Sequence, residues 1–114
     1  MSWGVVYISI GNSDDKLTQF QWAAYFSDVA LAVQEAAKAP GGAVHGQWAS
    51  EPASAWQNAC WALQLPVDVG PIARLEERLA ELAGMYRQDS IAWAVAPDTE
   101  FIRPAAPIEG AERG

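Results

Sequence analysis

The chain has 114 residues, of which 51% are hydrophobic, and it carries a formal net charge of −7 at pH 7. A chain of this length forms one hydrophobic core, and its apolar content allows it to fold without a disulfide or a structural metal. Because nucleic-acid backbones and anionic membranes are also negatively charged, the acidic balance disfavours both as partners.

The first half of the chain predicts a strand, a helix and a second strand. Residues 4–10 are rich in β-branched and aromatic side chains and end at a glycine, as a central strand does. Residues 17–37 contain no Gly or Pro, and their apolar side chains recur every three to four positions, which predicts an amphipathic helix. In the segment AVHGQW, residues 43–48, alternation predicts a half-buried strand. Its buried face would hold Val44, Gly46 and Trp48, and its exposed face His45 and Gln47.

The second half of the chain predicts a strand, a helix and a strand again. Residues 56–65 alternate, with Ala59, Trp61, Leu63 and Leu65 directed toward the core. Pro71 suits the first position of a second helix, and its apolar face would contain Ile72, Leu75, Leu79, Leu82 and Tyr86. The run SIAWAVA, residues 90–96, predicts a fourth strand that buries Ile91, Trp93 and Val95. Residues 100–102, EFI, could add a short fifth edge strand.

The order strand–helix–strand–strand–helix–strand predicts the α+β fold of ferredoxin-like domains. Right-handed crossovers give an antiparallel sheet with strand order 4132 and both helices on one face, a βαββαβ sandwich. We expect one domain over residues 1–102 and a flexible C-terminal tail over residues 103–114. Such a fold supports many functions, so the function has to be sought in particular sites.

This topology brings several polar segments to one edge of the sheet, which we call the polar rim. The rim collects the end of the first strand, the turn between the second and third strands, and the start of the fourth strand. Its candidate binding residues are Asn12, Asp14, Asp15, Trp56, Gln57, Asn58, Gln88 and Asp89. A partner-binding surface is one interpretation of this convergence, and a set of residues that stabilise turns is the other.

The segment GNSDDK, residues 11–16, illustrates that choice. Ser13 or Asp14 is expected to cap the first helix, and Asp15 would interact favourably with the helix dipole. If the rim aspartates converged on a metal, Mg²⁺ or Mn²⁺ would suit the oxygen ligands. The sequence contains no ligand-spacing motif, so neither a metal nor another cofactor is predicted.

The run VVYISIGNSDDK is similar in shape to the first strand and loop of the CRISPR-associated Cas2 nucleases, which are ferredoxin-like. That resemblance implies a metal-binding carboxylate at the end of the strand and hence metal-dependent nuclease activity. Ser9 or Ile10 stands where the carboxylate is expected, and the basic pair that follows it in the family is missing.

His45 and Cys60 are candidates for a nucleophilic dyad, because an adjacent imidazole promotes the thiolate. Aligning Trp48 with Gln57 across the predicted hairpin pairs His45 with Cys60 on the outward face. No third orienting group is identifiable, and a single cysteine is more often a small apolar residue of the interior.

The sheet face away from the helices is predicted to be apolar but lined by small side chains. It would contain Tyr7, Ser9, Asn58, Cys60, Ala62, Gln64, Ala92 and Ala94. We expect a second copy of the chain to cover this face, giving a homodimer. The leading interpretation is therefore a small acidic, non-catalytic binding or regulatory module that engages a protein partner. The alternative is a dimeric α+β barrel enzyme or small-molecule-binding protein that uses a cavity at this face.

Two further expectations concern the setting of the protein. The single cysteine cannot form an internal disulfide, no basic N-terminal region precedes the first strand, and no apolar run reaches the roughly 18 residues needed to cross a bilayer. A cytoplasmic protein is expected. Its high alanine content and its preference for Arg over Lys are typical of a GC-rich genome, such as that of an actinobacterium or its phage.

Overall fold

The computed structural model of the chain describes residues 3–12, 16–51, 54, 56–66, 69–97, 100 and 102–105. Four strands and two helices follow one another in the predicted order. They are β1 (Trp3–Gly11), α1 (Gln19–Ala36), β2 (Ala43–Ala49), β3 (Asn58–Pro66), α2 (Val69–Met85) and β4 (Ala92–Ala96).

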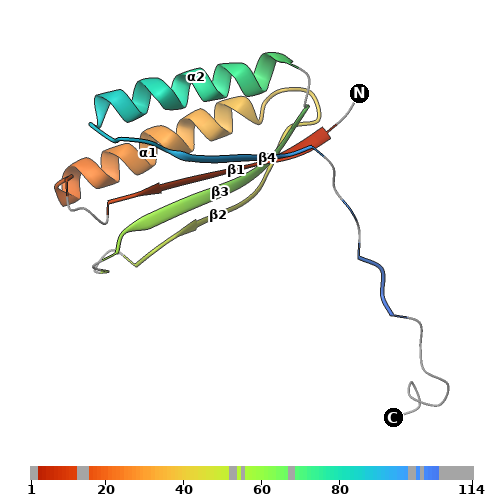
Figure 1. Cartoon of the computed structure of the whole chain (residues 1–114), viewed down its shortest axis with the longest axis horizontal. Coiled ribbons are helices and arrows are strands. Elements are labelled where there is room, and N and C mark those ends of the chain that lie inside the picture. The colour runs from red at the N-terminus through yellow and green to blue at the C-terminus, as the bar shows by residue number, and fades with distance from the viewer. Residues whose placement is uncertain are drawn as a thin grey trace, which may run out of the picture.

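The strands form one antiparallel sheet in the order β2-β3-β1-β4, which is the predicted order 4132 counted from the other edge. Figure 1 shows both helices on the same side of this sheet, with β2 at the edge farther from them. The chain therefore has the ferredoxin-like α+β fold. One face of the sheet is covered by helices, and we call the other the open sheet face.

The core lies between the two central strands and the helices. β3 alternates as predicted, and β1 alternates beside it, so that every second side chain of the two strands enters the core. The strand residues of the core are Val6, Ile8, Ile10, Ala59, Trp61, Leu63 and Leu65. Opposite them, α1 contributes Tyr25, Val29 and Val33, and α2 contributes Leu75, Leu79 and Leu82.

Tyr25 is a core residue that the sequence did not reveal, and its side chain is completely buried. Its ring packs against Tyr86, the residue after α2, with ring centroids 4.8 Å apart, and so links α1 to the end of α2. Its hydroxyl oxygen has no hydrogen-bond partner among the described residues. An unpaired buried hydroxyl is costly, so the Tyr25 ring stabilises the helix pair at the expense of one unsatisfied polar group.

Both helices begin at positions other than those predicted. Thr18 is the N-cap of α1, and it forms a capping box with Gln21, so the prediction of a cap at Ser13 or Asp14 is wrong. Those two residues themselves lie outside the described part of the chain. α2 begins at Val69, so Pro71 stands at its third position. Proline is tolerated there because the first-turn N–H groups have no partner within the helix.

The predicted alternation of β2 is wrong. All seven residues of β2 are exposed, because the strand lies at the sheet edge that the helices leave uncovered. A bulge between Val44 and Gly46 shifts the register, so that Gln47 lies opposite Trp61 and Trp48 opposite Cys60. Gln47 accepts a hydrogen bond from the Trp61 indole N–H at 2.7 Å, whereas Trp48 lies on the open sheet face.

The chain after β4 forms no strand at its described residues. Glu100 and Ile102 are not in a strand, and Ile102 is 99% exposed, while Phe101 lies outside the described residues. Among the described helices, neither is long and apolar enough to cross a membrane. The boundary between domain and tail stays a prediction.

Candidate functional site

The polar rim unites three segments that are distant in sequence. The Asn12 N–H, at the end of β1, donates to the Gln57 carbonyl before β3 at 2.8 Å. The Lys16 ammonium donates to the Arg87 carbonyl after α2 at 3.1 Å, and the Arg87 guanidinium donates to the Lys16 carbonyl at 3.3 Å. Asp14 and Asp15 lie outside the described residues.

Asn12 and Gln57 are buried, with exposed fractions of 2% and 3%. The Asn12 carboxamide oxygen accepts from the Leu17 N–H at 2.9 Å, and its amide group donates to the Leu17 carbonyl at 3.0 Å and to the Gln57 side-chain oxygen at 2.9 Å. A buried amide that is so fully hydrogen-bonded has little capacity left for a ligand. We call this pair the Asn12–Gln57 clamp, and its contacts stabilise the fold.

The clamp also fixes the start of α1. The Gln57 amide donates to the Gln19 side-chain oxygen at 2.7 Å, and Gln19 is the first residue of α1. Leu17, whose backbone Asn12 holds, places its side chain in the core at 2% exposure. The loop between β1 and α1 is therefore tied at both the strand end and the helix start.

Two further amides of the rim, the exposed Asn58 and the half-buried Gln88, bond to nearby backbone. The Asn58 amide donates to the Trp56 carbonyl at 3.0 Å, and the Gln88 amide donates to the Tyr86 carbonyl at 3.0 Å. Both bonds span two residues, which is typical of side chains that stabilise turns. Trp56 differs from these amides, because its side chain is apolar and the residue is 67% exposed.

Arg87 and Asp89 complete the turn between α2 and β4. Arg87 has φ of 56°, the left-handed conformation that ends many helices, and the Gln88 N–H donates to the Ala83 carbonyl at 2.8 Å. The Asp89 carboxylate is 98% exposed and lies 3.8 Å from the Lys16 ammonium. An ion pair so exposed contributes little to stability, and its solvated carboxylate stays accessible.

The described residues offer no metal centre: no three His, Cys, Asp or Glu side chains among them are placed to hold an ion. The resemblance to metal-dependent nucleases required a carboxylate at the end of β1. Ile10 is instead buried in the core at 5% exposure, and Ser9 lies on the open sheet face.

The predicted pairing of His45 with Cys60 is wrong. Cys60 lies opposite Trp48, and the ring nitrogen Nε2 of His45 lies 3.3 Å from the side-chain oxygen of Gln64. The prediction assumed a shorter hairpin loop, because it matched Trp48 with Gln57, whereas the strands pair up to Ala49 and Ala59. The bulge and the longer loop move Cys60 away from the imidazole, so the two residues form no dyad.

The shifted pKa values belong to the contact between the helices. Burial raises the pKa of Tyr25 to about 12. The Tyr86 hydroxyl donates to the Asp28 carboxylate, and this bond, followed by burial and the charge of Asp28, raises the pKa of Tyr86. Both hydroxyls therefore stay protonated at neutral pH, and neither acts there as a general base.

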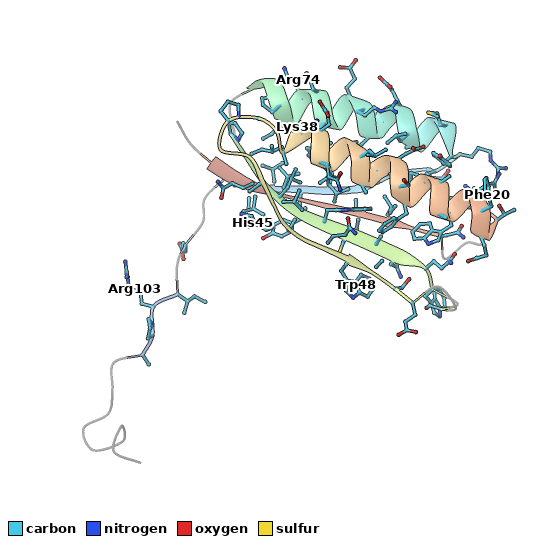
Figure 2. All side chains as sticks on the ribbon, turned by 180° about the vertical axis from the view of Figure 1, so that it is seen from behind. Phe20, Lys38, His45, Trp48, Arg74 and Arg103 are labelled. Carbon is cyan, nitrogen blue, oxygen red and sulfur yellow. The ribbon has the colours of Figure 1, made fainter. Side chains whose placement is uncertain are left out.

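The open sheet face presents aromatic rings among small side chains. Tyr7 is 49% exposed and lies between Ala62 and Ala94 on the neighbouring strands, and Trp48 is 55% exposed opposite Cys60. In Figure 2 the Trp48 side chain lies beside β2, on the side of the sheet away from both helices. The sequence prediction missed Trp48 at this face, although Gly46 within the strand was a signal for the bulge that turns it there.

Neither a family model nor a curated protein matches this chain. Its structure is similar to the de novo designed protein Foldit4, with a TM-score of 0.59, 15% identity and coverage of 85% of this chain and 99% of that one. The C-terminal domain of MgtC from Mycobacterium tuberculosis gives a TM-score of 0.47, 12% identity and coverage of 88% and 93%. A dimeric ferredoxin-like protein from an uncultured marine organism gives 0.44, 8% identity and coverage of 91% and 95%. At these identities, what the proteins share is the fold.

Proposed function

We propose that the chain is a non-catalytic binding module, which forms a homodimer through the open sheet face and engages a protein partner. One observation carries this proposal: Tyr7 and Trp48 are half exposed on a face that no helix covers. Tyrosine and tryptophan are enriched in protein interfaces, where they bury a large apolar area.

The surroundings of these two rings support close packing of a second sheet. Tyr7 has an alanine on either side, Ala62 on β3 and Ala94 on β4, and Ala92 lies one row away beside Ser9. Small side chains let two sheets approach to the usual spacing of about 10 Å, with the larger rings of one sheet filling the spaces over the alanines of the other.

The polar residues of the described chain support a non-catalytic role. The clamp amides are buried and hydrogen-bonded within the fold, and the amides of Asn58 and Gln88 bond to local backbone. The imidazole of His45 and the thiol of Cys60 are separated. Catalysis needs a nucleophile or proton carrier within reach of an orienting group, and these candidate groups are not arranged in that way.

Light scattering on the purified chain tests the proposal. At tens of micromolar, on the order of the concentrations at which weak dimers form, we expect a mass near twice the chain mass of 12.3 kDa. Ala94→Glu and Tyr7→Lys each place a charge on the open sheet face and should give a monomer, because burying an unpaired charge is costly.

Phe20→Lys is the matched control. Phe20 is 85% exposed at the start of α1, away from the open sheet face, so this variant should stay dimeric. A monomeric wild type, or loss of the dimer in Phe20→Lys as readily as in Tyr7→Lys, would contradict the proposal.

A further inference from the structure

The outer edge of β4 is unpaired in the described chain. β4 is the last strand of the sheet, and its described backbone pairs only with β1. Every second residue of such a strand turns its N–H and C=O groups outward, ready to pair with another strand. β4 also lacks the usual protections of an edge, because its sequence AWAVA contains no charge and no proline.

An apolar groove runs beside this edge, between β4 and α2. Its volume is about 380 Å³, and its apolar lining comes from Leu79, Ala80, Ala83, Gly84, Ile91 and Trp93. A Cβ atom added at Gly84 would meet no atom within 4 Å, so the groove is open over that residue. Side chains from an added strand could therefore enter the groove without displacing the helix.

The length of the groove matches a short strand. Its lining on α2 extends from Glu76 to Gly84, eight positions, which is about 12 Å along the helix. β4 has five residues, and a strand of that length spans about 17 Å. An added strand of five residues would therefore pair with the whole edge, and about three to four of its residues would lie along the groove.

The charges of the groove favour a basic occupant. Its charged lining residues are Glu76 and Asp89, both acidic and both exposed. A second copy of this chain placed there would bring the same two carboxylates to the contact, so it is disfavoured at the groove. Lys or Arg side chains near the ends of a peptide could instead reach the two carboxylates.

We propose that the groove between α2 and β4 binds an extended segment of a partner protein, which adds to the sheet beside β4 as a fifth strand. The segment carries apolar side chains at alternate positions, which enter the groove, and Lys or Arg near its ends. Main-chain hydrogen bonds supply affinity in this mode of recognition, and alternate side chains supply specificity. The inference rests on the proposed binding role, but it does not require the homodimer.

The probe is the synthetic peptide Lys-Val-Thr-Val-Thr-Val-Lys, capped at both ends and titrated into the ¹⁵N-labelled chain. We expect the amide signals of residues 92–96 to shift, and the outward N–H groups among them to exchange with solvent at least about tenfold more slowly, as hydrogen-bonded amides do. Two control peptides should bind at least about tenfold more weakly. One has Glu in place of both Lys residues, and the other has Pro in place of the central Val.

Gly84→Leu tests the groove itself, because the leucine side chain extends into its open space. This variant should melt no earlier than the wild type, because leucine is favoured over glycine in a helix. It should lose at least about tenfold in affinity for the peptide. Ala73→Leu is the matched control, since Ala73 is exposed on the same helix and does not line the groove. It should bind the peptide as the wild type does.

Three results would overturn the inference: no change at residues 92–96 with millimolar peptide, equal binding of the Glu-ended peptide, or equal binding by Gly84→Leu. Each can be obtained whether or not the chain is a dimer. If the wild type is monomeric but the peptide slows amide exchange along β4, only the dimer of the proposed function is refuted. If the wild type is dimeric but the peptide does not slow that exchange, only the groove is refuted.

Discussion

The polar rim and the open sheet face use their side chains in opposite ways. At the rim, Asn12 and Gln57 are polar but buried, and their hydrogen bonds hold the loops together. On the open sheet face, Tyr7 and Trp48 are apolar but half exposed, and no element of the described chain covers them. Convergent polar residues are thus a weak sign of a binding site, because loops that meet must satisfy their own backbone groups first.

Substitutions should distinguish these two regions by their effect on stability. Asn12→Ala should lower the free energy of unfolding the most. It leaves the Leu17 N–H and the Leu17 carbonyl without their present partners, and it removes a donor from Gln57. We expect the free energy of unfolding to fall by roughly 3 kcal/mol, measured by urea denaturation. Asn58→Ala removes only an exposed hydrogen bond and should lose much less stability. Equal losses in the two variants would show that the clamp contributes no more to stability than an exposed hydrogen bond.

Because Tyr25 is buried, the stability of the chain should fall at alkaline pH. Its pKa is raised to about 12 from an ordinary value of 10, so the folded state keeps the hydroxyl protonated where the unfolded state ionises. Stability is therefore full below pH 10 and falls as the pH rises toward 12, by roughly 1.4 kcal/mol at pH 11 for this group.

Urea denaturation at pH 8 and pH 11 measures this loss, with Tyr25→Phe as the control. The variant should lose less stability on going to pH 11, and the remaining loss should include that of Tyr86, whose pKa is raised as well. An equal loss in both proteins would show that Tyr25 ionises as easily in the folded state as in the unfolded one.

Gly84→Ala should stabilise the chain. Gly84 lies within α2, its φ is not in the left-handed region, and an added Cβ would meet no atom within 4 Å. Alanine is favoured over glycine in a helix by about 1 kcal/mol, and the thermal midpoint should rise accordingly. Lowered stability would mean that the groove beside α2 is closed rather than open.

Asp89→Ala should have the smallest effect on stability. The carboxylate is 98% exposed and 3.8 Å from the Lys16 ammonium, so the thermal midpoint should not change measurably. Removal of this charge should nevertheless weaken binding of the Lys-ended peptide, because Asp89 is one of the two acidic groups of the groove. A large loss of stability would place Asp89 among the residues that hold the rim together.

The element order and the two central strands were predictable, because the hydrophobic pattern is strong in strands that have a paired strand on each side. The sequence of β3 follows its alternation between core and open face, and the continuous apolar run of β1 marks it as a central strand. β2 was not predictable in the same way, because an exposed edge strand has no buried face to impose a pattern. The bulge then exchanged the sides of Gln47 and Trp48.

For the candidate site, the sequence predicted which segments meet but not which side chains bond to one another. Topology placed the rim segments together, but whether Asn12 faces a ligand or Leu17 depends on side-chain packing that no periodicity encodes. The cap of α1 had several candidates of similar propensity in the sequence, and Thr18 is favoured by its partner Gln21. The groove beside β4 depends on where α2 crosses the sheet, which a single sequence does not specify.

The reactivity of Cys60 tests most directly whether a second copy covers the open sheet face. Cys60 is the one cysteine of the chain, is partly exposed, and lies on that face between Ser9 and Trp48. The rate of its reaction with a thiol reagent, measured over a range of protein concentrations, should fall as concentration rises, while Tyr7→Lys should react at one rate throughout. A wild-type rate that does not depend on concentration and equals that of Tyr7→Lys would contradict the homodimer.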